Sequence, residues 1–209
     1  MKLSGLYVIT DEHLIPDQQL LPHVQSAVDN GASVIQYRAK TKPLTQQIKQ
    51  AKALAQICHD AGRLFLVNDN LILAIESQAD GVHLGQNDRT LKEARILLGK
   101  QAIIGITCHQ SLTLAYQAEK DSANYVAFGR FFPSKTKPNA PAVNIDILRY
   151  AKTQLSIPIV AIGGITPDNG KPLLSAGADM LAVIHSIFGA KDPGLASKAM
   201  HALFQKQGN

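Results

Sequence analysis

Two cationic side chains and an amide alternate along one short segment of the chain. Gln36, Arg38 and Lys40 are separated by single residues and follow an apolar run. Because side chains alternate along an extended segment, all three point the same way. Buried cations need a counter-charge. An anionic ligand would supply it, and ion pairs with nearby carboxylates are the alternative.

Acidic and amide side chains follow two further apolar runs. Asn68 and Asp69 come after residues 64–67, and Asp88 follows residues 81–84. If these runs are neighbouring parallel strands about 4.8 Å apart, the two carboxylates lie near each other. Mg²⁺ is commonly held by one or two carboxylates together with substrate phosphates. The alternative is that each aspartate caps the following helix.

His83 lies between two glycines, Gly81 and Gly85, in the second of these runs. We expect it to face inward, with the glycines leaving space for a flat ligand close to the backbone. A lone histidine on a strand is also compatible with an ordinary hydrogen-bonded core position.

Candidate phosphate-binding groups lie in the last third of the chain. Ser134, Thr136 and Lys137 occupy a polar, proline-containing loop, which is either functional or simply solvent-exposed. Gly163 and Gly164 end another apolar run, and the segment formed by Ile184, His185 and Ser186 ends the last one. Paired glycines allow a ligand to approach the backbone, and barrels often bind phosphate with the amides of their last two loops.

The order of the apolar runs predicts the architecture that positions these groups. Strands are expected at 6–9, 34–38, 64–67, 81–84, 103–106, 125–128, 159–162 and 180–184, alternating with helical patterns such as 44–61. A small and a polar residue precede several strands, as in Ala79-Asp80, Ala123-Asn124 and Ala178-Asp179. Eight strands with intervening helices favour an α/β fold, a (β/α)₈ TIM barrel forming one domain over residues 1–209. A doubly wound sheet is disfavoured because no G-x-G-x-x-G follows the first strand.

Composition narrows the class of partner. The net charge is +5, but the 21 Lys and Arg residues are scattered and there is no Trp, so nucleic-acid binding is not expected. Cys58 and Cys108 match no metal or redox spacing and predict reduced thiols in a cytoplasmic protein. No apolar stretch has signal-peptide or membrane-spanning length, so no membrane partner is expected.

Taken together, these motifs resemble those of thiamine-phosphate synthases. The resemblance rests on Gln36, Arg38 and Lys40; on Asn68 and Asp69; on Gly81 to Gln86 followed by Asp88; on Thr136 and Lys137; and on Gly163 to Ile165. The motifs occur in the family's order and spacing, from the second expected strand to the eighth. The resemblance implies that hydroxymethylpyrimidine diphosphate is joined to a thiazole ethyl phosphate, with thiamine phosphate and pyrophosphate as products.

The resemblance also implies a role for each matching residue. Arg38, Lys40, Asn68 and Lys137 would hold the diphosphate, Asp69 and Asp88 would hold Mg²⁺, Gln36 and His83 would lie by the pyrimidine, and Thr136, Gly164 and the backbone of Ile184, His185 and Ser186 would bind the thiazole phosphate. Thr107 stands where the family usually has serine, and Ser134 where it often has threonine; either hydroxyl can bind phosphate. Catalysis would then fall to Arg38, Lys40, Lys137 and Thr107.

Other functions remain open from the sequence. A thiazole tautomerase shares the barrel but would not need the diphosphate and metal groups, and His109 is a residue it could use. A sugar-phosphate isomerase or aldolase would call for a Lys or Glu base on a strand, which is not evident. A non-catalytic phospholigand-binding module is the alternative from a different class, and a homo-oligomer is compatible with any of these functions.

Overall fold

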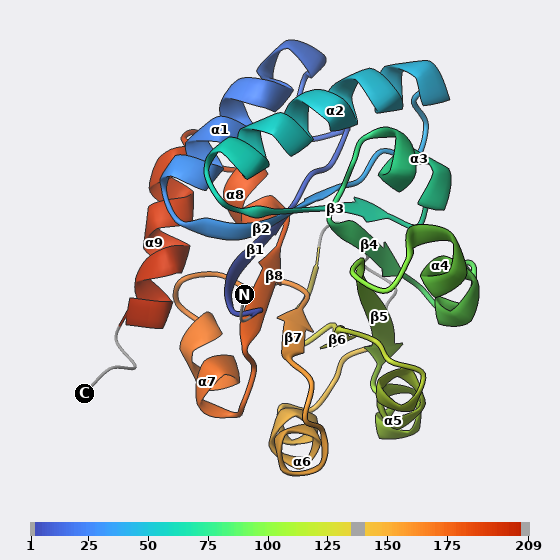
Figure 1. The fold of residues 1–209 in the computed structure, drawn as a ribbon. Helices are drawn as coiled ribbons and strands as arrows, with labels where there is room; N and C mark the ends of the chain where they lie inside the picture. Colours follow the sequence, from blue (N-terminus) through green and yellow to red (C-terminus); the bar gives the residue numbers. More distant parts are fainter. Residues whose placement is uncertain (1–2, 135–140, 206–209) are drawn as a thin grey trace.

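A computed structural model describes residues 3–134 and 141–205 of the chain. Strands and helices alternate along these residues (Figure 1). The strands are β1 (Gly5–Ile9), β2 (Ala32–Tyr37), β3 (Leu64–Asn68), β4 (Gly81–Leu84), β5 (Ile103–His109), β6 (Tyr125–Phe128), β7 (Ile159–Ile162) and β8 (Met180–Val183). The helices are η1 (Asp17–Gln19), α1 (Leu20–Asp29), α2 (Leu44–Asp60), α3 (Leu71–Glu76), α4 (Leu91–Leu98), α5 (Leu112–Lys120), α6 (Asp146–Gln154), α7 (Gly170–Ser175), α8 (His185–Phe188) and α9 (Pro193–Gln205).

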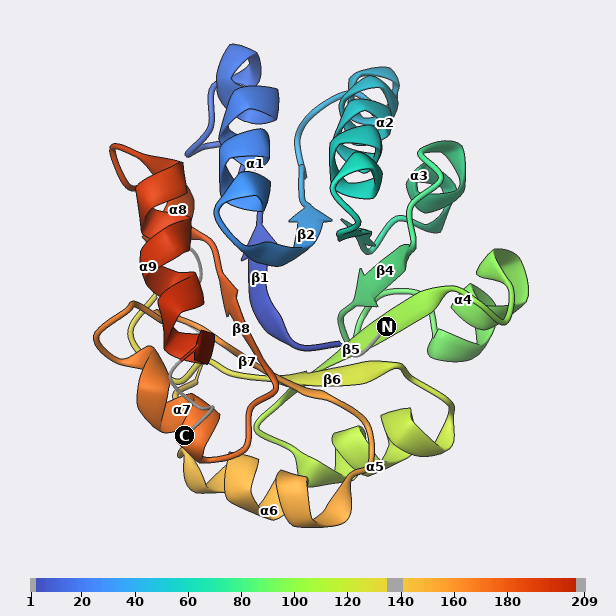
Figure 2. The same ribbon diagram turned by 60° about the vertical axis from the view of Figure 1, so that its left-hand side comes forward.

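The eight strands close into a parallel barrel in sequence order, with β1 paired to both β2 and β8. Figure 2 shows the helices arranged around the outside of these strands. The predicted (β/α)₈ fold is therefore confirmed, and three of the eight predicted strands have the observed bounds. The largest difference is β5, which continues to His109 through a register irregularity between Thr107 and His109. Within the described ranges, no helix has the length and apolar character needed to cross a bilayer.

Apolar side chains pack in two layers, one outside the barrel strands and one inside them. The outer layer joins strands to helices and includes the buried thiols Cys58 and Cys108. The inner layer fills the barrel with side chains such as Tyr7, Leu66 and Tyr125. Because both faces of each strand are covered, the strands read as continuous apolar runs, and polar residues within or just after them stand out.

The small–polar pairs that precede several strands have a structural reason at the amino ends of the barrel strands. Each polar side chain accepts a hydrogen bond from the backbone N–H of the preceding strand: Asp80 from Phe65 (2.7 Å), Asn124 from Ile104 (2.9 Å) and Asp179 from Ile159 (2.9 Å). A basic residue of the even-numbered helix that precedes each pair of strands binds the same side chain: His59 of α2, Arg95 of α4 and Lys152 of α6 respectively. The sequence repeat therefore reports a structural repeat of two strands and their helices.

Arg95 is the most extensively bonded of these basic residues and gives a test of the repeat. Its guanidinium donates to the carbonyls of residues 99, 100, 102 and 122 and to the Asn124 side chain. We expect Arg95→Met to lower the free energy of unfolding by about 2 kcal/mol, because hydrogen bonds from a charged group are lost and their carbonyl acceptors are left behind. Thermal unfolding should show a fall in Tm of about 4–8 °C. Lys92→Met, on an exposed position of the same helix, is the control and should leave Tm unchanged.

Candidate active site

A chain of hydrogen bonds crosses the interior of the barrel. Gln36 Nε2 lies 2.5 Å from the Tyr7 hydroxyl, which lies 2.9 Å from the Tyr125 hydroxyl. The chain continues from Tyr125 to His83 Nδ1 at 2.9 Å and from His83 Nε2 to Thr107 Oγ1 at 2.8 Å. The structure thus brings together three predicted residues, Gln36, His83 and Thr107, through two tyrosines.

Gln36 donates its amide hydrogen to the Tyr7 hydroxyl, which fixes the first bond of the chain. The hydroxyls of Tyr7 and Tyr125 each can donate and accept, and each ring nitrogen of His83 donates in one tautomer and accepts in the other. The chain can therefore run in either direction between Tyr7 and Thr107. Such a network orients the polar groups at the centre of the barrel before any ligand arrives.

Tyr7 and Tyr125 belong to the candidate site by their hydrogen bonds, and the sequence reasoning missed them. Both are buried, and burial raises the pKa of each phenol above its ordinary range. They were hidden because each lies in an apolar run, where a tyrosine reads as core. The available signal was Gly105 on the strand beside β6: an added Cβ there would lie 1.9 Å from the Tyr125 ring. The glycine therefore makes room for the tyrosine.

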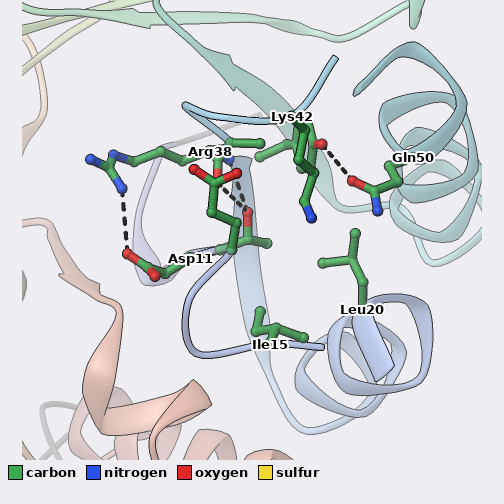
Figure 3. A pocket seen from close by; sticks show the side chains of 10 residues that line it. Asp11, Ile15, Leu20, Arg38, Lys42 and Gln50 are labelled. Carbon is green, nitrogen blue, oxygen red and sulfur yellow. Dashed lines mark hydrogen bonds and ion pairs between the residues drawn. The ribbon is translucent and has the colours of Figure 1, made fainter. Parts of the chain in front are cut away.

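The two predicted cations each have a carboxylate partner at the end of β2. Arg38 Nη1 lies 3.4 Å from Asp11 Oδ2, and Asp11 is 5% exposed (Figure 3). Lys40 forms an ion pair with Asp69, which also accepts from the Asn68 amide. Pairing with nearby carboxylates, the alternative raised from sequence, therefore occurs. The ion pair of Lys40 with Asp69 also joins a predicted diphosphate-binding cation to a candidate metal ligand.

The predicted metal ligands Asp69 and Asp88 lie next to each other. Burial, the hydrogen bond with Asp69 and the negative charge of that carboxylate raise the pKa of Asp88. Neither aspartate is a helix cap, so that alternative is wrong: Asn70 caps α3 and Thr90 caps α4. Asp69 has φ 60°, a left-handed conformation that is uncommon outside glycine and is found at strained functional positions.

The acidic pair fits Mg²⁺ better than a metal that requires a complete protein cage. Within residues 3–134 and 141–205, no group of three or more His, Cys, Asp or Glu side chains could hold an ion. Mg²⁺ is usually held by one or two carboxylates, with waters and substrate phosphates completing its shell. Two carboxylates beside Lys40 meet that requirement. Because their negative charges repel each other, a bound cation would stabilise the pair.

Protein atoms fill the space that the glycines on either side of His83 were expected to leave. An added Cβ on Gly81 would lie 1.8 Å from the carbonyl oxygen of Ile103, and one on Gly85 would lie 2.8 Å from the Asp88 carboxylate. The glycines therefore allow β5 and the Asp88 side chain to pack closely. The prediction that they leave room for a flat ligand is wrong in these two places.

The paired glycines after β7 also have a packing role. Gly163 and Gly164 have φ 107° and 64°, which favours glycine. Added Cβ atoms there would lie 2.2 Å from Arg130 Cβ and 2.3 Å from the Pro133 carbonyl oxygen. The segment after β6 thus occupies the space that was expected for a ligand. Binding of phosphate by Gly164 remains a prediction.

The remaining predicted residues lie in the last loops. Ser186 donates its hydroxyl to the Ile165 carbonyl, which ties the start of α8 to the loop after β7. Ile184 and His185 form the N-cap and first residue of α8, at the carboxyl end of β8. Ser134 follows β6. Thr136 and Lys137 lie outside the described residues.

Several known proteins resemble this chain in sequence and in fold. Residues 6–187 match a family model described as thiamine monophosphate synthase. The chain is 48% identical to a thiamine-phosphate synthase of Alcanivorax borkumensis over 98% of this chain and 95% of that protein. It is 46% identical to one from Nitrosococcus oceani, over 97% and 93% respectively. A solved thiamine phosphate pyrophosphorylase from Pyrococcus furiosus superposes with a TM-score of 0.89 at 35% identity, covering 97% of this chain and 96% of that one.

Proposed function

The chain belongs to the thiamine-phosphate synthase family, and we propose that it joins hydroxymethylpyrimidine diphosphate to a thiazole ethyl phosphate, releasing pyrophosphate. One observation carries the assignment of substrate class: the contact of Lys40 with Asp69, beside Asp88. A cation that touches an acidic pair suits a diphosphate, because the ammonium can bind the phosphate oxygens and the carboxylates would hold a metal ion that neutralises their charge.

The diphosphate is assigned to the ends of β2 and β3. Arg38 and Lys40 supply fixed positive charge, the Asn68 amide supplies a neutral donor, and Lys137 belongs to the same set by the family's pattern. Asp69 and Asp88 would hold Mg²⁺, the cofactor that the family implies. When bound, Mg²⁺ would neutralise charge on the departing diphosphate.

The pyrimidine is assigned to the polar groups of the barrel interior, Gln36 and His83. Thr107, whose hydroxyl lies at the end of the hydrogen-bond chain, is assigned to a phosphate oxygen. The thiazole phosphate is assigned to the last loops: Ser134, Thr136, Gly164 and the backbone of Ile184, His185 and Ser186. These loops lie at the carboxyl ends of the strands, where barrel enzymes hold their substrates.

The proposed reaction needs charge stabilisation more than proton transfer. The carbon–oxygen bond to the diphosphate breaks, and the thiazole nitrogen, which carries no proton, then attacks the pyrimidine methylene carbon. His83 suits a positioning role, because both of its ring nitrogens are already hydrogen-bonded, Nδ1 with Tyr125 and Nε2 with Thr107. Rate acceleration would come from the fixed cations and from the alignment of two bound rings.

The test is the formation of thiamine phosphate from the two substrates, with and without Mg²⁺, followed by chromatography. Mg²⁺-dependent product is the expected result. If folded protein and verified substrates give no product, the synthase assignment fails, and a thiazole tautomerase assay with a His109→Asn variant becomes the next measurement. We further propose that residues 1–209 form one catalytic domain of a cytoplasmic enzyme.

A further inference from the structure

The loop that follows β1 holds the backbone of the predicted diphosphate-binding segment. We propose that Glu12 is a positioning residue, which fixes Lys40 for the diphosphate by binding the backbone N–H groups of Lys40 and Thr41. The proposal rests on the proposed function, since it assigns a second layer to the same site. Neither the motifs nor the resemblance gives Glu12 a role.

Side chains of the first loop bind the second loop in register. Beyond the strands, the Thr10 hydroxyl oxygen accepts from the Arg38 N–H at 2.9 Å. The next residue, Asp11, receives the Arg38 guanidinium. The pairing of β1 with β2 thus continues past the end of β2 through side chains. Figure 3 shows Arg38 reaching Asp11 across the space between the two loops.

Glu12 completes this series. Its Oε1 accepts from the backbone N–H groups of Lys40 (2.7 Å) and Thr41 (3.0 Å), and its Oε2 accepts from the Thr41 hydroxyl (3.0 Å). Burial opposes the charged form, but these hydrogen bonds prevail and lower the pKa of Glu12. The carboxylate therefore stays charged and binds a turn that has no strand pairing of its own.

The charge of Glu12 makes its role distinguishable. A carboxylate near a diphosphate site weakens anion binding by electrostatics alone, so its neutralisation should strengthen binding. Loss of positioning has the opposite effect, because Lys40 and the backbone around it become free to move. Opposite signs let one measurement separate the two roles.

Asp17, the first residue of η1, offers a matched control close to the same loop. Asp17 accepts hydrogen bonds from Lys42, Gln46 and Gln50, so it also ties the first loop to the chain that follows β2. It makes none of the contacts to residues 38–41 that are described above. Asp17→Ala therefore removes a similar tether, with the same change of charge, away from the predicted site.

The experiment compares Glu12→Ala, Glu12→Gln and Asp17→Ala in the full chain. Steady-state rates give KM for each substrate, and calorimetry gives Kd for inorganic pyrophosphate with Mg²⁺. For Glu12→Ala we expect KM for the pyrimidine diphosphate and Kd for pyrophosphate to rise about tenfold, which corresponds to about 1.4 kcal/mol. Glu12→Gln keeps one oxygen acceptor and should recover part of the loss. KM for the thiazole phosphate, and all values for Asp17→Ala, should stay within about twofold.

Each result decides the proposal. Unchanged or tighter pyrophosphate binding by Glu12→Ala overturns it, as does an equal rise in KM for both substrates. If Glu12→Ala is unfolded, the glutamine variant decides by the same two criteria. A wild-type chain that makes no thiamine phosphate but binds pyrophosphate refutes only the proposed function, and the binding comparison still tests Glu12. A wild-type chain that does not bind pyrophosphate refutes the positioning role as well.

Discussion

Asp69→Asn and Asp88→Asn should each reduce turnover by about a hundredfold or more while the protein remains folded. The expected size follows from losing a charged ligand of the proposed Mg²⁺, which would stabilise the leaving group, a loss of several kcal/mol. The Mg²⁺ concentration for half-maximal rate should rise in both variants. Rates measured across a Mg²⁺ titration report both effects.

The structure predicts that these two variants will be stable. Asparagine tolerates the left-handed backbone of Asp69. In Asp88→Asn the amide oxygen can still accept from the Gly85 N–H, and one of two adjacent negative charges is removed. Thermal unfolding close to that of the wild-type chain is therefore expected. Asp168→Asn is the control, since Asp168 is exposed in the loop after β7. Full activity of both variants would sink the metal assignment.

The fold could be predicted because parallel barrel strands are buried on both faces. Their apolar runs are short and continuous, so strands such as β4 and β6 have the bounds that the sequence indicates. Polar residues at the ends of these runs, such as Arg38 and Asp69, identified the side of the barrel where chemistry is expected. The sequence therefore indicated the site through polar residues that interrupt or end the apolar runs.

The parts that could not be predicted depend on contacts between distant segments. Tyr125 carries its hydroxyl on an apolar ring, so nothing in its own strand distinguishes it from core, and its partners Tyr7 and His83 are 118 and 42 residues away. The glycines were misread for a related reason. A glycine shows that something approaches the backbone but not what, and at Gly81 and Gly163 it is protein.

Glu12 lies between these two cases. It is a carboxylate in a polar loop, a place where most carboxylates are simply solvated. Its role depends on the backbone N–H groups of Lys40 and Thr41. The pairing of β1 with β2 brings these groups within reach of the Glu12 carboxylate. Every residue except proline has a backbone N–H, so residue type does not show which of these donors is used. A contact to backbone donors can therefore be identified only in the folded chain.

Arg38 is expected to have two separable roles, one in the reaction and one in the fold. Arg38→Met removes a fixed cation from the predicted diphosphate site, and we expect kcat/KM to fall by about a hundredfold or more. It also leaves the buried carboxylate of Asp11 without its cation, which should lower the free energy of unfolding by about 2 kcal/mol. Enzyme kinetics and denaturant unfolding measure the two effects independently.

A second substitution separates the effect of Arg38→Met on activity from its effect on stability. Asp11→Asn in the Arg38→Met background removes the unpaired charge, and its amide oxygen can still accept from the His13 N–H. Stability should then return while activity does not, because nothing replaces the cation. If the double variant instead recovered activity together with stability, Arg38 would act through the fold alone. The diphosphate would then have to be held without it, by Lys40 and the acidic pair beside it.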